Sequence, residues 1–214
     1  MRRFLWLAGL ALVLSGCGPT VAERVRVYNE EGVHLFQHGD YLTARQCFEM
    51  ALALQPEDAG LQFNIGKCYY RQGNVAKAEE MYRDCLNREP NHARCRHALA
   101  VLLVNTKRRK EAVFMVESWL AKEPKLSDAY AEDGWLWHQA GDLPQAQARL
   151  QQALDKDPHN LRALIELGEV YDELGLPERA LVLYEHSLDL DPRQPDLVQR
   201  VNRLKAKGIA PPKP

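Results

Sequence analysis

Prolines recur along most of this chain at a constant interval of 34 residues, at Pro56, Pro90, Pro124, Pro158 and Pro192. Proline has no backbone N–H and clashes with the preceding helical turn, so a helix ends before it. An interval of 34 residues has room for two helices and two turns. We therefore expect an array of helical hairpins, each ended by one of these prolines.

Small and large apolar residues recur in phase with the prolines. One position of each interval is small, at Gly32, Gly66, Ala100, Gly134 and Gly168, and another is always alanine, at Ala44, Ala78, Ala112, Ala146 and Ala180. A third position is large and apolar, at Phe48, Tyr82, Val116, Leu150 and Tyr184. Small residues allow two antiparallel helices to approach closely, and the larger side chains fill the space beside them. Gly39, Gly73, Gly141 and Gly175 then suit the turns within hairpins.

This pattern resembles the tetratricopeptide repeat over residues 25–194. The resemblance implies an all-α, right-handed solenoid of five repeats, at 25–58, 59–92, 93–126, 127–160 and 161–194. Residues 195–207 are expected to form a capping helix, since Leu197, Val201 and Leu204 have helical spacing, and residues 208–214 a flexible tail. The third repeat departs most from the pattern, with Ala100 and Lys107 where other repeats have glycine.

The N-terminus has the form of an export signal. Arg2 and Arg3 precede an apolar run from Phe4 to Leu14, which as a helix would reach roughly 16 Å and is too short to span a membrane. The tetrad that ends at Cys17 resembles the lipobox of bacterial lipoproteins, which implies a signal peptide at 1–16, acylation of Cys17 and a tether at 17–24. Gly18 after the cysteine favours the outer membrane in that family. The alternative is an ordinary cleaved signal.

Composition and motifs exclude several functions. A net charge of −1 lacks the excess of Lys and Arg that a nucleic-acid binder needs. P-loop, G-x-S-x-G, H-E-x-x-H and paired C-x-x-C motifs are absent, so we predict no enzyme, no cofactor and no metal. The alternative is a metal-binding or enzyme-associated protein that uses His34 and His38, with Glu31 or Asp40 as a third ligand.

Four cysteines remain after Cys17. In a hairpin stack the end of one repeat lies beside the start of the next, which favours a disulfide between Cys85 and Cys95 and, less strongly, one between Cys47 and Cys68. The alternative is that all four are small buried apolar residues.

The family resemblance also implies a concave groove lined by the first helix of each repeat. The positions carried over as a partner-binding groove are Arg26, Phe36, Phe63, Lys67, Tyr70, Arg71, Arg94, His97, Trp135, His138, Glu169 and Asp172. The front of this groove is basic and aromatic and its rear is acidic, which would orient a ligand of mixed charge. Only two of five positions match the members that clamp a chaperone's C-terminal carboxylate, so that role is not expected.

These features predict a lipid-anchored scaffold that faces the periplasm and binds a protein or peptide segment in support of an envelope assembly. Pilus or secretion machinery is the first hypothesis, an adaptor for peptidoglycan hydrolases is an alternative, and self-association is a further one. The resemblance to such lipoproteins rests on architecture alone.

Overall fold

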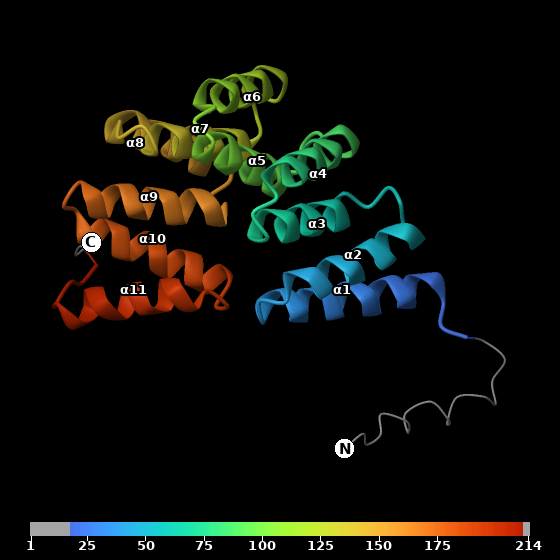
Figure 1. The fold of residues 1–214 in the computed structure, drawn as a ribbon. Coiled ribbons are helices and arrows are strands. Elements are labelled where there is room, and N and C mark those ends of the chain that lie inside the picture. The colour runs from blue at the N-terminus through green and yellow to red at the C-terminus, as the bar shows by residue number, and fades with distance from the viewer. Residues whose placement is uncertain (1–17, 212–214) are drawn as a thin grey trace. The chain divides into compact units, whose positions relative to one another are not determined.

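A computed structural model describes residues 18–211, and within them the chain forms eleven α-helices and no strand (Figure 1). The helices are α1 (Val21–Gln37), α2 (Tyr41–Leu54), α3 (Ala59–Arg71), α4 (Val75–Arg88), α5 (Ala93–Asn105), α6 (Arg109–Lys122), α7 (Ser127–His138), α8 (Leu143–Lys156), α9 (Leu161–Glu173), α10 (Pro177–Leu190) and α11 (Pro195–Ala206). The all-α prediction is confirmed. The signal peptide and Cys17 lie outside the described residues. None of the described helices has the length and apolar character needed to cross a membrane.

The described helices form two compact units that divide between Leu99 and Ala100, within α5. Unit 1 lies before this division and unit 2 after it. In unit 1, α1 packs on α2, α2 on α3 and α3 on α4. In unit 2, each helix from α6 to α10 packs on its successor, and α7 also contacts α9. Consecutive helices within each unit are therefore neighbours, which is the packing of stacked hairpins (Figure 1).

Each periodic proline lies two residues beyond the end of a helix. Helices α2, α4, α6, α8 and α10 end at Leu54, Arg88, Lys122, Lys156 and Leu190. The prolines that follow are Pro56, Pro90, Pro124, Pro158 and Pro192. The second helix of each hairpin therefore ends before the residue that cannot continue it.

The small residues of the first helices lie directly against the large residues of the second. A Cβ on Gly32 would lie 2.6 Å from Phe48 Cε1, and one on Gly66 would lie 2.6 Å from Tyr82 Cε1. Gly134 meets Leu150 and Gly168 meets Tyr184 in the same way. The alanines of the second series are fully buried. Close approach of the paired helices is thus the physical reason for the small residues.

The turns within hairpins require a left-handed residue. Gly39, Gly73, Gly141 and Gly175 have φ between 73° and 84°, and Lys107 takes the equivalent place in the third repeat with φ 61°. Lys107 is the only non-glycine residue with positive φ among those described. Lys107, which replaces the glycine of the other repeats, therefore has a strained backbone conformation.

Two expectations about the ends of the array need correction. Helix α1 begins at Val21 behind a capping box formed by Thr20 and Glu23, so residues 21–24 belong to the folded body and not to the tether. At the other end, the predicted flexible tail starts too early. Ile209 packs against the core of unit 2, and its N–H donates to Leu204 O at 3.2 Å.

Candidate binding site

Unit 1 carries a continuous row of cations and aromatic rings, which we call the cation–aromatic ladder. Its members are Arg71, Tyr41, Phe36, Lys67, Phe63 and Arg94. The Lys67 Nζ lies 4.5 Å from the centre of the Phe36 ring and 5.5 Å from that of Phe63. Arg94 lies over the far side of the row, with its Cζ 5.3 Å from the Phe63 centroid. Arg71 lies over the Tyr41 ring at 5.0 Å, and Tyr41 contacts Phe36 at 5.1 Å.

Most of the ladder comes from the first helices of three successive hairpins, with Phe36 on α1, Lys67 on α3 and Arg94 on α5. Among the described residues, no ion pair involves Lys67, Arg71 or Arg94, and Arg71 instead donates to the Tyr41 hydroxyl at 2.6 Å. The pKa of Lys67 is lowered by burial and by the nearby charges of Arg94 and Arg71. Within residues 18–211 the ladder is therefore a row of cations that form no ion pair with a carboxylate.

A cavity of about 180 Å³ opens beside the ladder. Its lining residues are Val33, Phe36, Gln37, Phe48, Asn64 and Lys67. Asn64 Nδ2 donates to Asn29 Oδ1 at 3.3 Å, which joins α3 to α1 at this point. The cavity thus offers an apolar wall, an amide and an ammonium group in one place, a combination typical of sites that bind a side chain with a polar end.

The other groove positions predicted in unit 1 differ from the ladder. Arg26 forms an exposed pair with Glu30 at 3.0 Å on the same helix. Tyr70 and His97 are half-buried. Phe63 is only 8% exposed, so it supports Lys67 and Arg94 more than it faces solvent. Tyr41 was not predicted, because it starts a second helix and the groove positions were taken from first helices alone.

In unit 2 the corresponding face is a network of paired charges. His138 Nε2 lies 3.1 Å from Glu173 Oε1, and its Nδ1 lies 3.4 Å from Glu166 Oε2. Burial acts to lower the pKa of His138, but hydrogen bonds with Glu173 and Glu166 raise it overall. Burial and the neighbouring charge of Glu169 raise the pKa of Glu166, in spite of the nearby His138.

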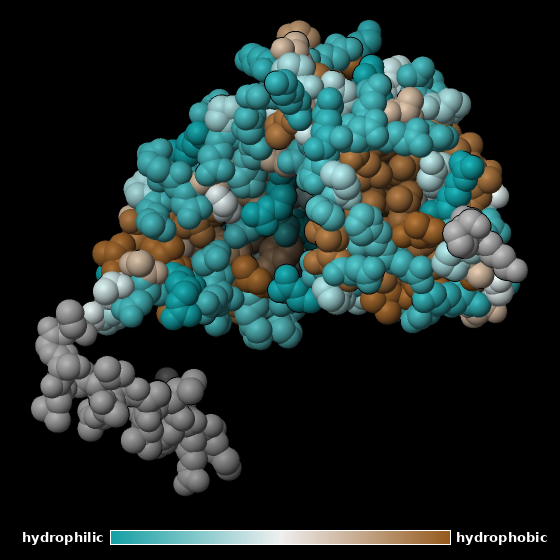
Figure 2. All heavy atoms as spheres, turned by 180° about the vertical axis from the view of Figure 1, so that it is seen from behind, coloured by the Kyte–Doolittle hydropathy of each residue, from teal (hydrophilic) through white to brown (hydrophobic). Residues whose placement is uncertain are grey.

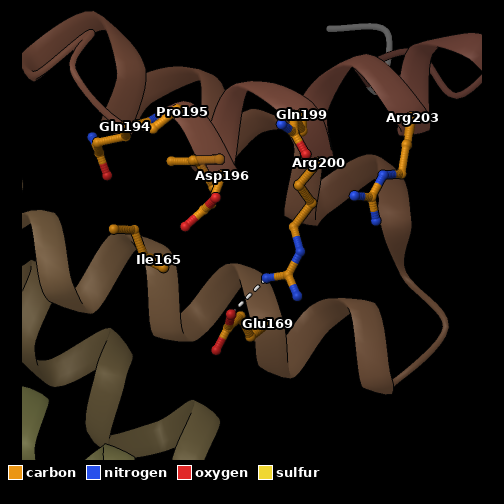
Figure 3. A pocket seen from close by; sticks show the side chains of 9 residues that line it. Ile165, Glu169, Gln194, Pro195, Asp196, Gln199, Arg200 and Arg203 are labelled. Atoms are coloured by element: carbon orange, nitrogen blue, oxygen red, sulfur yellow. Dashed lines mark hydrogen bonds and ion pairs between the residues drawn. The ribbon is translucent and has the colours of Figure 1, made fainter. Parts of the chain in front are cut away.

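Helix α11 completes this network and forms a pocket with α9. Arg200 Nη1 lies 2.6 Å from Glu169 Oε1 and donates to the Tyr184 hydroxyl at 3.2 Å, while that hydroxyl donates to Asp172 Oδ2 at 2.9 Å. Figure 3 shows Arg200 extending across the pocket from α11 toward Glu169, with Arg203 further along the same helix. The pocket volume is about 520 Å³. The sequence assigned α11 to capping and missed this wall of the pocket.

Several predicted features fall outside these two faces. Trp135 is 7% exposed and belongs to the interior of the array. Exposed apolar side chains occur on α1, α2, α6, α7, α10 and α11. The face seen from behind shows hydrophobic patches among hydrophilic residues (Figure 2). Exposed apolar surface alone does not show which partner, if any, would cover it.

The cysteines divide into one pair and two free thiols. Cys85 and Cys95 form a disulfide with a Cα–Cα distance of 6.5 Å, which joins the end of α4 to the start of α5. Cys47 and Cys68 are free and buried, so the second predicted pairing is wrong. Burial raises the pKa of Cys68 to about 12, as expected for a thiol that acts as an apolar core residue.

Within residues 18–211, two groups place three metal-ligating side chains together: Cys85, His92 and Cys95, and His138, Glu166 and Glu169. Neither group includes His34 or His38, whose tilted rings lie 4.2 Å apart between centroids while His38 Nδ1 lies 2.8 Å from the His34 carbonyl oxygen. In the second group, ion pairs already occupy His138 and Glu169. The histidine pair that the sequence offered therefore has no third ligand beside it among the described residues.

Stacked helical hairpins with a polar, partly cationic face define a repeat scaffold suited to protein–protein interaction. Family profiles described as tetratricopeptide repeat match residues 74–132 and 138–207, and a second such profile matches 29–93. The chain belongs to the tetratricopeptide-repeat family. Repeats of this family are typically non-catalytic.

Similar proteins place these repeats in very different contexts. Human protein O-mannosyl-transferase TMTC3 is 26% identical over 208 residues, which are 90% of this chain and 23% of that protein. Cellulose synthase operon protein C of Pseudomonas fluorescens (strain SBW25) is 28% identical over 172 residues, 77% of this chain and 13% of that protein. The chain thus spans less than a quarter of the length of these relatives.

Among solved structures, the thermophilic TPR protein TTC0263 of Thermus thermophilus is similar to this chain with a TM-score of 0.65 and 23% identity. The match covers 85% of this chain and 99% of that one. At this identity the similarity concerns the fold alone.

Proposed function

We propose that this protein is a non-catalytic, lipid-anchored scaffold whose cation–aromatic ladder binds an acidic segment of a partner protein. The observation that carries the proposal is the unneutralised charge of Lys67, Arg71 and Arg94 beside aromatic rings and a cavity. A carboxylate placed at Lys67 would form charge-assisted hydrogen bonds there, and an adjacent aliphatic side chain would fill the apolar side of the cavity.

Binding of an acidic segment also removes a cost that the free protein bears. Burial and the charges of Arg94 and Arg71 disfavour the protonated form of Lys67, and for this reason its pKa is lowered. A bound carboxylate would stabilise that protonated form and offset the repulsion among the three cations. Affinity should therefore depend on charge and should fall as salt screens the attraction.

A direct test uses two fluorescein-labelled peptides of equal length, one alternating Glu and Leu and the other alternating Lys and Leu. Fluorescence anisotropy with the full chain should show tighter binding of the Glu/Leu peptide and weaker binding of that peptide at higher salt. Equal binding of both peptides, or preference for the Lys/Leu peptide, would contradict an acidic partner.

The anchor part of the proposal rests on the N-terminal tetrad and on the short distance from it to the folded body. Only Gly18 and Pro19 separate Cys17 from Thr20, the capping residue of α1. Three residues span at most about 11 Å, so an acylated Cys17 would hold unit 1 close to a membrane surface. Two or three acyl chains are enough for stable anchoring.

Cell fractionation tests the anchor. Wild-type protein should co-sediment with membranes and incorporate labelled palmitate, whereas Cys17→Ser should lose the label. Equal incorporation of the label in both forms would contradict acylation at Cys17. In a bacterium with two membranes, we expect the label in the outer-membrane fraction, with the repeats facing the periplasm.

For the assembly that this scaffold supports, pilus or secretion machinery is the first candidate and peptidoglycan hydrolases are the second. Both are assembled or anchored in the cell envelope, where a lipid-anchored scaffold could hold a protein segment. Self-association remains a prediction, and sedimentation of the chain at several concentrations tests it.

A further inference from the structure

The turn between α4 and α5 gathers three side chains that bind transition metals. Cys85 lies in the last turn of α4, His92 in the connection and Cys95 in the first turn of α5. Both cysteines are fully buried, while His92 is half-buried. One donor atom of each residue lies within 4.8 Å of the other two. The three donors thus converge on one point at the edge of unit 1.

His92 is held in place by two contacts. Its Nδ1 lies 3.1 Å from the backbone nitrogen of Cys95 and accepts its N–H, the usual bond of a helix cap, and its ring lies 5.8 Å from that of Phe63. The metal needs a ring nitrogen with a free lone pair, so zinc binding replaces this bond to the Cys95 N–H, either at Nδ1 itself or at Nε2 after the ring proton moves to Nδ1. Cys95 lies in the first turn of α5, where the helix dipole favours the negative charge of a thiolate.

We propose that Cys85, His92 and Cys95 bind one zinc ion when the disulfide is reduced. Tetrahedral zinc with Zn–S bonds of about 2.3 Å and Zn–N bonds of about 2.1 Å places its ligands roughly 3.6–3.8 Å apart. Small movements of the imidazole and of each sulfur, once the two sulfurs are no longer bonded, bring the three donors to that spacing. Three protein ligands leave the fourth position to water.

The two states are exclusive because they use the same sulfurs. A dithiol or phosphine reductant supplies two electrons, the S–S bond breaks, and each sulfur takes up a proton from solvent while the reductant is oxidised. Zinc then replaces both thiol protons, which return to solvent. The turn can thus be closed either by a disulfide or by a metal ion. The other thiols, Cys47 and Cys68, belong to no group of three ligands among the described residues.

The test uses the full chain, reduced with a phosphine, freed of metal and titrated with Zn²⁺ against a chromophoric chelator. We expect one zinc per reduced chain and none per oxidised chain. Replacement by Co²⁺ should give the absorption of a tetrahedral site with sulfur ligands. Bound zinc should also protect Cys85 and Cys95 from alkylation.

The matched variant is His92→Asn, because asparagine keeps a side-chain oxygen for the cap and removes the imidazole. Its zinc affinity should fall by roughly tenfold or more, while its melting temperature in the oxidised form stays close to that of the wild type. Cys47→Ser should bind zinc as the wild type does. Absence of zinc from the reduced chain, unchanged affinity in His92→Asn, or equal binding by oxidised protein would overturn the proposal.

Discussion

The two units use equivalent helix positions but treat charge in opposite ways. In unit 1, Lys67 and Arg94 lie over aromatic rings and form no ion pair with the described residues. In unit 2, the cations on α7 and α9 are matched, since His138 lies between Glu166 and Glu173 and Arg162 pairs with the buried Glu132 at 3.0 Å. Among the described residues, the same hairpin scaffold therefore leaves these cations of unit 1 without ion pairs and pairs those on α7 and α9 of unit 2.

This difference arises from a few residues. Lys67 and Glu169 come from equivalent first helices, three repeats apart, but α11 provides Arg200 to neutralise Glu169. Of the two arginines that line the pocket in Figure 3, Arg200 forms this ion pair and Arg203 forms none with the described residues. The repeat fold thus determines which positions share a face, and the residue at each position determines whether the charges on that face are paired.

The largest effect is expected from charge reversal in the ladder. Lys67→Glu should weaken binding of the Glu/Leu peptide by tenfold or more, because a charge-assisted hydrogen bond contributes about 1.5–3 kcal/mol. Arg203→Glu makes the same change in unit 2, and Arg26→Glu makes it elsewhere in unit 1. Anisotropy titrations should show little change for either control. Equal losses in all three variants would mean that net charge, and not the ladder, determines binding.

Loss of the disulfide should come next in size and should affect unit 1, which contains both cysteines. The bond closes a loop with a sequence separation of 10, for which loop entropy predicts a contribution of about 2–3 kcal/mol. Thermal melts with and without a phosphine reductant, in the presence of a metal chelator, measure this contribution. A double variant, Cys85→Ala with Cys95→Ala, should melt alike in both conditions. An unchanged melt of the wild type on reduction would contradict the bond.

Valine in place of Gly66 or Gly168 should lower the free energy of unfolding by about 1–3 kcal/mol, because the added atoms overlap the facing tyrosine ring. We expect Gly168→Val to cost more than Gly66→Val. Valine at 168 displaces the Tyr184 ring, whose hydroxyl donates to Asp172 and accepts from Arg200, so the network of unit 2 is disturbed as well. Denaturant melts compare the two variants. A smaller loss of stability in Gly168→Val than in Gly66→Val would show that the network does not depend on Tyr184.

A pH effect should separate unit 2 from unit 1. His138 has a raised pKa in the folded state, so its ion pairs stabilise the protein below the unfolded value of about 6.5, and this contribution disappears as pH rises through the folded pKa. His138→Gln should therefore cost more at pH 5.5 than at pH 8, by less than about 1 kcal/mol because Glu173 is exposed. Melts at both pH values measure it. An equal cost at both would contradict a charged His138.

The smallest effect concerns the strained turn of unit 2. Lys107→Gly should stabilise the chain by a few tenths of a kcal/mol, because relief of the left-handed strain exceeds the entropy that glycine adds to the unfolded state. Gly141→Lys, the reverse change at an equivalent turn, should destabilise it. A melting temperature that falls in Lys107→Gly would show that the strain is not significant.

The sequence predicted the fold well because the signals were repeated. Each proline, glycine and alanine of the 34-residue pattern has a steric role that a neighbour cannot take over, so position and residue type together indicate the structure. The start of α1 was missed because Thr20 and Glu23 form a cap that lies ahead of the first repeat. The core contact of Ile209 was missed because this residue lies after the last 34-residue repeat, where the pattern makes no prediction.

The candidate site was less predictable, because charges depend on partners from other helices. Family positions placed Lys67, Phe36 and Arg94 on one face, but the same rule included Trp135, which is buried, and Arg26, which pairs with Glu30. No spacing rule indicates that Arg200 reaches Glu169 from α11 or that Tyr41 joins the ladder from α2. Such contacts depend on how the helices pack, and the 34-residue spacing does not predict them.

Binding of an acidic segment at the ladder can be tested with a photo-crosslinker at position 36, beside Lys67, in intact cells, with the captured segment sequenced by mass spectrometry. We expect a partner segment rich in Asp and Glu, and its capture should be lost in a Lys67→Glu background but kept in Arg203→Glu. Capture of neutral or basic segments, or capture that persists in Lys67→Glu, would contradict it.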